Sequence, residues 1–281
     1  MQRKFLVNLA LSLFLNILVK PFWIFGIDRT VQNTVGLADY GFYLNIFNFA
    51  FLFNILLDAG ITNFNNRNIA QHSHLLNKHF SSILILKFLL TILYVAVTFS
   101  IALIIGYRGA ELKMLAWVGF NQFLLSFILY LRSNISGMLM FITDSMISVL
   151  DRLLMILICS VLLWGDLTGG AFRIEWFVYA QTAAYLATAA VAFIIVMRKA
   201  KFSRLKWNRN FFLVILRKSM PFAVLFLLMA VYNRVDTVYL ERMIDGEEGD
   251  RQVGIYAHGF RLLDAVNQFA WLTAVVFFPL Y

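Results

Sequence analysis

Long apolar runs recur along the chain, and they constrain the fold more than any other feature. A helix needs about 20 predominantly apolar residues to cross the hydrocarbon core of a membrane. Dividing the chain at charged and glycine-rich stretches predicts about eight such spans. They are residues 5–26, 42–61, 81–106, 113–135, 145–164, 176–197, 219–240 and 254–280. The sequence therefore predicts an all-α, polytopic membrane protein without a large catalytic domain outside the membrane.

Composition supports this interpretation. Hydrophobic residues make up 61% of the chain and charged residues 14%, which is too little polar surface to cover a soluble globule. The basic start at residues 1–4, followed by the first span, resembles a secretory signal. However, the apolar run is too long and no small-residue cleavage site follows it, so we interpret it as a retained helix.

Basic residues concentrate between the sixth and seventh spans, where no acidic residue occurs. They are Arg198, Lys199, Lys201, Arg204, Lys206, Arg209, Arg217 and Lys218. Under the positive-inside rule this segment is cytoplasmic, which places the N-terminus in the cytoplasm and the acidic loop 241–253 outside. Topology and mild attraction to anionic lipids account for the net charge of +9, so we expect no nucleic-acid partner.

Several spans carry polar residues three or four positions apart, and such residues share one helix face. They are Asn8, Ser12, Asn16 and Lys20 in the first span, Lys87, Thr91, Tyr94 and Thr98 in the third, Gln181, Tyr185 and Thr188 in the sixth, and His258, Arg261, Asp264 and Gln268 in the last. Hydrogen-bonded helix contacts would explain these faces. A shared water-filled cavity explains the lysines and arginine more economically, because a charge is costly in lipid.

The seventh span places two ionisable residues inside an apolar run. Arg234 and Asp236 are two positions apart, so on a helix they point about 200° away from each other and cannot pair locally. Each requires a partner on another helix, a ligand or water. An interhelical ion pair that only stabilises the bundle is the alternative to a functional role.

Metal, cofactor and nucleotide chemistry have little support in the sequence. Cys159 is the only cysteine, and His72, His74 and His79 lie in one loop without a nearby carboxylate. No phosphate-binding GxxxxGK[ST] motif occurs, so ATP hydrolysis by this chain is not expected. We predict no cofactor, no metal site and no enzymatic activity, and a sodium or proton gradient as the energy source for any transport.

A faint internal repeat divides the chain. Gly41-Phe42-Tyr43 opens the second span, and Gly254-Ile255-Tyr256 opens the eighth, an offset of 213 residues (254 − 41). Transporters are often built from such repeats, with the binding site between them. We expect a six-helix lobe over 1–197, a basic cytoplasmic linker over 198–218, and the first two helices of a second, incomplete lobe over 219–281.

Three groups of residues resemble a known family, the Wzx-like flippases of the multidrug/oligosaccharidyl-lipid/polysaccharide exporter superfamily. The first is Gly36-Leu37-Ala38-Asp39-Tyr40-Gly41, similar to the family's LGxxxYG, and the second is Leu56-Leu57-Asp58-Ala59-Gly60-Ile61 with Arg67, similar to LLDxGL...R. The third is Ser219-Met220-Pro221-Phe222, Asn233-Arg234-Val235-Asp236, Val253-Gly254-Ile255-Tyr256, Arg261-Leu262-Leu263 and Pro279. Asn33 departs from the pattern, because many relatives have a cation there.

The resemblance implies transfer of an undecaprenyl-diphosphate-linked oligosaccharide to the outer leaflet of the bacterial cytoplasmic membrane. This step would serve lipopolysaccharide or another surface polysaccharide, by alternating access between two lobes and alongside other polysaccharide-assembly proteins. Such proteins usually have twelve or more helices, so the chain resembles an N-terminal portion of one.

Candidate site residues follow from this implied substrate. A diphosphate inside a membrane cavity requires cations, and the candidates are Lys20, Arg67, Arg234 and Arg261. The candidates for ion coupling are Asp236, Asp58 and Asp264. Two alternatives stay open: Arg67 is an ordinary charge of an inner loop, and Asp264 is the local ion-pair partner of Arg261.

Three other functions compete with a flippase. A small-molecule drug exporter of the same superfamily would favour an acid-lined cavity, whereas the charges within these spans lean cationic. A glycan polymerase or ligase would need a sizeable outer loop with catalytic Arg or His, and the loop 241–253 is short and acidic. An inactive fragment is the third alternative.

Overall fold

The computed structural model describes residues 14–71, 75–165, 172–199, 209–244, 246, 248–257, 259, 260, 263 and 266. Within these residues every regular element is a helix and no strand occurs. The predicted all-α class is confirmed.

Four helices in the described part of the chain are long and apolar enough to span a membrane. They are Phe80–Ile105 within α6 (Leu75–Ile105), α7 (Ala110–Gly137), α8 (Phe141–Trp164) and α9 (Ile174–Lys199). A fifth span forms if α3 (Leu37–Leu52) and the helical segment Ile55–Gln71 count as one, bent by 44°. The predicted seventh span lies within α10 (Arg209–Met243), and the total of eight spans stays a prediction.

The chain divides into two compact units by its internal contacts. Unit 1 comprises residues 1–45, 145–184 and 239–281, and unit 2 comprises residues 46–144 and 185–238. Four helices, α3, α8, α9 and α10, contribute residues to both units. The lobe boundaries predicted from the sequence stay a prediction.

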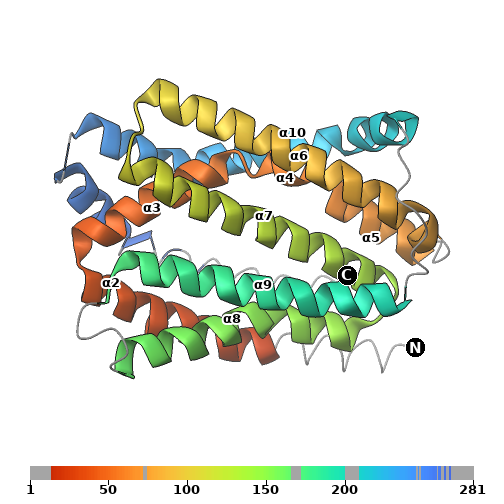
Figure 1. Cartoon of the computed structure of the whole chain (residues 1–281), viewed down its shortest axis with the longest axis horizontal. Coiled ribbons are helices and arrows are strands. Elements are labelled where there is room, and N and C mark those ends of the chain that lie inside the picture. Colours follow the sequence, from red (N-terminus) through yellow and green to blue (C-terminus); the bar gives the residue numbers. More distant parts are fainter. Residues whose placement is uncertain are drawn as a thin grey trace. The chain divides into compact units, whose positions relative to one another are not determined.

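In unit 1 the first helix continues beyond the predicted end of its span. Residues 14–20 are helical, and after Pro21 the chain forms the π-helix η1 (Phe22–Asp28) and then α2 (Arg29–Val35), as Figure 1 shows. The segment 27–41, which separates the first two predicted spans, is therefore mostly helix. Hydropathy marks only the apolar length, whereas the helix ends at Gly36, whose φ of 89° favours glycine.

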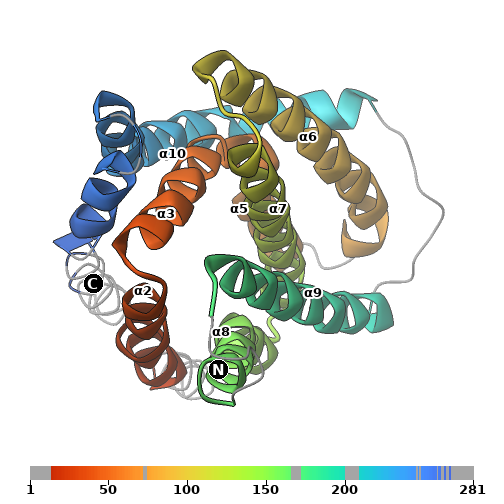
Figure 2. The same ribbon diagram turned by 60° about the vertical axis from the view of Figure 1, so that its left-hand side comes forward.

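In unit 2, glycines and one strained residue separate the long helices. α6 ends at Gly106 with φ of 101°, and α7 follows Gly109 with φ of 53°. Leu139, with φ of 60°, separates α7 from α8, so the predicted boundary between the fourth and fifth spans is a true helix break. Across that break, Arg132 Nε donates to Asp144 Oδ1 at 2.8 Å. Helices α5 (Ile61–Gln71), α6 and α7 lie side by side (Figures 1 and 2).

Candidate functional site

The second predicted span is broken near its end. α3 ends at Leu52, α4 is a single turn (Ile55–Asp58), and α5 begins at Ile61. Ala59 and Gly60, which lie between α4 and α5, have φ values of 46° and 77°. A left-handed residue cannot continue a right-handed helix, so backbone groups beside the break need partners outside it. The carbonyl of Leu57 is one of these groups.

Lys87 of α6 supplies the partner. Its ammonium donates hydrogen bonds to Leu57 O at 3.1 Å, Asp58 Oδ1 at 2.5 Å and Ser126 Oγ at 2.9 Å. An ammonium has three N–H donors, so all of them are used. The Lys87 side chain is 3% exposed, and its Nζ lies 6.0 Å from the centroid of the Tyr130 ring. We call Lys87, Asp58, Ser126 and the Leu57 carbonyl the Lys87 site.

Asp58 also holds the start of α5. Its Oδ2 accepts from the Thr62 N–H at 3.3 Å, and its Oδ1 accepts from Thr62 Oγ1 at 2.5 Å. N–H groups in the first turn of a helix have no partner within the helix, and a carboxylate there satisfies them and offsets the helix dipole. One side chain therefore caps α5 and neutralises Lys87, which makes the broken segment dependent on its charge.

Amide and hydroxyl pairs flank the Lys87 site on both sides along α7. Asn54 Nδ2 donates to Gln122 Oε1 at 3.0 Å, and Asn65 Nδ2 donates to Ser133 Oγ at 2.8 Å. These contacts join the broken segment to α7 at two points 11 residues apart (133 − 122), about three helical turns. The segment that most departs from regular helix is thus fixed by polar contacts rather than by apolar packing alone.

In unit 1 two glycines form a close backbone crossing. A Cβ on Gly41 would overlap the carbonyl oxygen of Asp250, and a Cβ on Gly254 would overlap that of Leu37. Leu37 precedes Gly41 by one helical turn, as Asp250 precedes Gly254, so the two contacts are reciprocal. Gly41 and Gly254 are also the matched glycines of the internal repeat. We call these four residues the glycine crossing, and only residues without a Cβ fit its two central positions.

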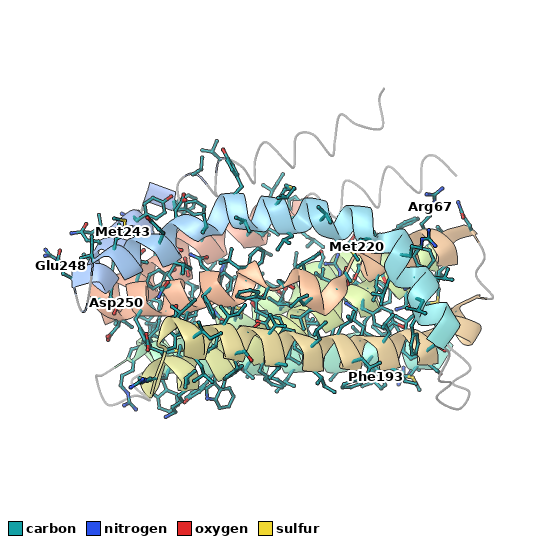
Figure 3. All side chains as sticks on the ribbon, turned by 90° about the horizontal axis from the view of Figure 1, so that it is seen from above. Arg67, Phe193, Met220, Met243, Glu248 and Asp250 are labelled. Atoms are coloured by element: carbon teal, nitrogen blue, oxygen red, sulfur yellow. The ribbon has the colours of Figure 1, made fainter. Side chains whose placement is uncertain are left out.

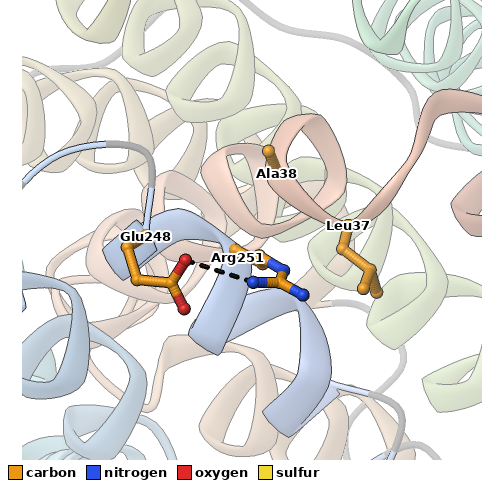
Figure 4. Close-up of a pocket in the computed structure, with 4 residues that line it drawn as sticks. All are labelled: Leu37, Ala38, Glu248 and Arg251. Carbon is orange, nitrogen blue, oxygen red and sulfur yellow. Dashed lines mark hydrogen bonds and ion pairs between the residues drawn. The ribbon is translucent and has the colours of Figure 1, made fainter.

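A hollow opens beside the glycine crossing (Figure 4). Leu37, Ala38, Glu248 and Arg251 line its volume of about 510 Å³. Arg251 Nη1 donates to Glu248 Oε2 at 3.3 Å, and both side chains are more than half exposed. Hydrogen bonds from Gln252 and Arg251 lower the pKa of Glu248. The two charged residues that the structure describes in its lining pair with each other at the surface.

Comparison with known proteins decides the family. The family model described as polysaccharide biosynthesis protein matches residues 10–281. The chain belongs to this family. The match confirms the resemblance carried by the motifs at 36–41 and 56–61. Searches of curated proteins and of solved structures found no match.

The two motifs of this polysaccharide biosynthesis protein have clear structural roles. In the first, Gly36 makes the turn, Gly41 enters the glycine crossing, and Tyr40 Oη donates to the buried Asp28 at 3.1 Å. In the second, Gly60 lies at the helix break and Asp58 binds Lys87. Both motifs therefore end a helix with a glycine and place a buried polar contact beside it.

Several residues of the predicted polar faces make hydrogen bonds between helices. In unit 1, Asn16 Nδ2 donates to Ser148 Oγ at 3.5 Å, and Gln181 Nε2 donates to Tyr43 Oη at 2.9 Å. In unit 2, Tyr94 Oη of α6 donates to a carbonyl oxygen of α3 at 3.1 Å. These hydrogen bonds support the interpretation that the polar faces join neighbouring helices, rather than the interpretation that they line a shared water-filled cavity. The face at 258–268 lies mostly outside the described residues.

Lys20 lies along a face that meets α8. Asn16, one turn before it, contacts Ser148, and the Arg152 guanidinium lies 5.5 Å from the centroid of the Trp23 ring. Lys20 is half-buried between these two contacts. The residues that contact α8, Asn16 and Trp23, therefore lie on either side of Lys20 in the sequence.

The structure does not gather the other predicted site residues into one place. Arg67 is exposed on α5 (Figure 3), and Asp236 is exposed on α10. The side chain of Arg234, and all of Arg261 and Asp264, lie outside the described residues, as do His72 and His74. Asp58 is the one predicted acid that the described structure places in a part-buried polar site between helices.

Sequence reasoning missed two features of that site. It placed Lys87 on a polar face without a partner, because nothing local links Lys87 to Asp58. It also passed over the polar face of α7. Gln122, Ser126, Tyr130 and Ser133 follow one another at spacings of four, four and three. That spacing places the four residues on one helix face and could have predicted the polar face of α7.

Proposed function

We propose that this protein transfers a lipid-diphosphate-linked oligosaccharide across the bacterial cytoplasmic membrane for surface polysaccharide assembly. Membership of the polysaccharide biosynthesis family over 10–281 is the observation that carries the proposal. Long apolar helices that bear buried polar contacts support it, because a transporter has to stabilise polar groups within the membrane. The proposed topology has a cytoplasmic N-terminus and an outer loop at 241–253.

The diphosphate is the part of such a substrate that most requires stabilisation by the protein inside the membrane. Each phosphate is anionic, and cationic side chains replace part of the hydration it loses in the membrane. Lys20, Arg67, Arg234 and Arg261 are the proposed ligands. Lys20 is half-buried, as a cavity-lining cation would be, whereas Arg67 is exposed and suits the first capture of a headgroup at the membrane surface.

Alternating access against a gradient requires an energy source, and we propose a sodium or proton gradient. Asp236 and Asp264 are the proposed coupling acids. Asp58 is also a candidate, but the ammonium of Lys87 already neutralises it. A dissolved ion at Asp58 would first have to displace that ammonium.

The amount of lipid-linked oligosaccharide in a deletion strain tests the proposed function. We expect the intermediate to accumulate on the inner leaflet when the gene is deleted, and to clear when residues 1–281 are expressed with any partner chain they require. Accumulation of a small cationic drug, with unchanged lipid-linked oligosaccharide, would contradict the proposal and support a drug exporter. Accumulation that residues 1–281 do not clear when expressed without a partner chain would show that this chain alone is inactive.

Two substitutions assign roles within the same assay. Arg234→Ala should abolish export at normal protein level if Arg234 binds the diphosphate, and near-normal export would contradict that role. Asp236→Asn should remove the dependence of export on pH or sodium. If the dependence is unchanged, Asp236 is structural.

A further inference from the structure

The Lys87 site has the ligand set of a cation site. A carboxylate oxygen, a main-chain carbonyl oxygen and a hydroxyl oxygen surround one point, at 2.5, 3.1 and 2.9 Å from Lys87 Nζ. Oxygen ligands of these kinds bind hard cations, and discontinuous helices commonly supply such carbonyls in membrane proteins. Asp58 supplies one negative charge to this site, so a cation with a single positive charge neutralises it.

The hydrogen-bond directions agree with a positive charge at that point. Ser126 Oγ accepts from Lys87 and donates its own proton to Leu57 O at 3.2 Å. Thr62 Oγ1 donates its proton to Asp58 Oδ1. The three oxygens therefore accept from the Lys87 ammonium, while the protons of both hydroxyls are donated to other oxygens of the site.

We propose that these oxygens form a binding site for one small monovalent cation, and that the chain fills it permanently with its own lysine. Lys87 is a tethered occupant, which reaches the site from α6 while the ligands come from α4 and α7. The broken second span is thereby held together without a dissolved ion. Shortening Lys87 should expose a site that takes an alkylammonium or sodium ion from solution.

The test measures thermal stability, and so it does not depend on the proposed function. Cys159 is replaced by Ser, and Ala102, buried on α6 itself, is replaced by Cys. A thiol-reactive dye then reports the opening of unit 2. In this background, Lys87→Ala is heated in the presence of propylammonium, sodium or N-methylglucamine chloride at equal ionic strength. Propylammonium has the carbons and nitrogen that the substitution removes.

We expect Lys87→Ala to lower the unfolding midpoint by roughly 5–15 °C, because it leaves the part-buried Asp58 carboxylate unpaired. Propylammonium should restore at least half of the loss, sodium part of it, and the bulky N-methylglucamine none. The parent with Lys87 intact should not respond to any of them. Asp58→Asn/Lys87→Ala, which has no charge to neutralise, should not respond either.

Two results would overturn the proposal. One is a folded Lys87→Ala variant that no cation stabilises more than N-methylglucamine does. The other is an equal response of Asp58→Asn/Lys87→Ala. If Lys87→Ala gives no folded protein, Ser126→Ala tests the proposal instead. Loss of this one oxygen ligand should lower the unfolding midpoint by a few degrees, and propylammonium should not restore it. An unchanged midpoint in Ser126→Ala would contradict the three-oxygen site.

Discussion

The glycine crossing in unit 1 and the Lys87 site in unit 2 hold helices together by opposite means. At the crossing, Gly41 and Gly254 lack side chains, and the backbones meet directly. At the Lys87 site, a long charged side chain from α6 fills a gap that the break at Ala59 and Gly60 creates. The glycine crossing tolerates no residue larger than glycine. The Lys87 site does not tolerate the loss of charge at Lys87 or Asp58 alone. The two regions should therefore fail under different substitutions.

Unbalancing the charge in unit 2 should have the largest effect. Asp58→Asn leaves the buried ammonium of Lys87 without its partner, and Lys87→Met leaves the part-buried carboxylate of Asp58 without its partner. Breaking such a pair on one side costs about 3–5 kcal/mol. We expect that loss in the free energy of unfolding, measured by SDS titration in mixed micelles. Lys113→Met, on the exposed start of α7, is the control and should change stability by less than about 0.5 kcal/mol. Equal effects at the two lysines would contradict the buried site.

Adding a methyl group at the glycine crossing should have the next largest effect. Gly41→Ala and Gly254→Ala should each destabilise the protein by about 2–3 kcal/mol, because the methyl meets a main-chain oxygen that cannot rotate away. Gly259→Ala, where a Cβ meets nothing within 4 Å, is the matched control. The double variant should lose less than the sum of the single losses, since the first methyl already separates the backbones.

The helix break in unit 2 allows a finer test with two neighbouring residues. Gly60→Ala should destabilise by about 1–2 kcal/mol, because φ of 77° is unfavourable for a residue with a Cβ. Ala59→Gly should instead stabilise by about 0.5–1 kcal/mol, since it relieves the same strain at φ of 46°. Opposite signs of the change in unfolding free energy at Ala59 and Gly60 would locate the helix break between α4 and α5. Changes of the same sign would contradict a break at these two residues.

The smallest effect is expected at the surface of unit 1. Hydrogen bonds from Gln252 and Arg251 lower the pKa of the exposed Glu248 below its ordinary 4.5. A lowered pKa in the folded state means that the stabilisation is complete above about pH 4.5 and is lost as the pH falls through the folded value. Unfolding midpoints of the parent and Glu248→Gln should therefore converge in acid. A difference that grows on acidification would contradict the contact.

Features set by backbone geometry could be predicted from the sequence. The repeat matched Gly41 with Gly254 before any contact was known, because a close approach permits only one residue type and so leaves a mark at both positions. Apolar length likewise predicted α6, α8 and α9. It failed at 27–41, where a single residue, Gly36, decides where the helix ends.

Charge pairing could not be predicted in the same way. Asp58 and Lys87 lie 29 residues apart on different helices, and neither carries a local sign of the other. A lysine in an apolar run indicates that a partner exists, but many residues satisfy that need equally well. Only the bend after α3 and the register of α6 bring Asp58, rather than another residue, to Lys87.

The coupling between Asp58 and Lys87 tests the central claim most directly. It is obtained from the unfolding free energies of the parent, Asp58→Asn, Lys87→Met and the double variant. If the two side chains form one neutral unit that holds the broken span, the double variant should recover most of either single loss, so the coupling free energy should exceed either single loss of about 3–5 kcal/mol. Additive losses would show that the two residues act separately, and would contradict the account.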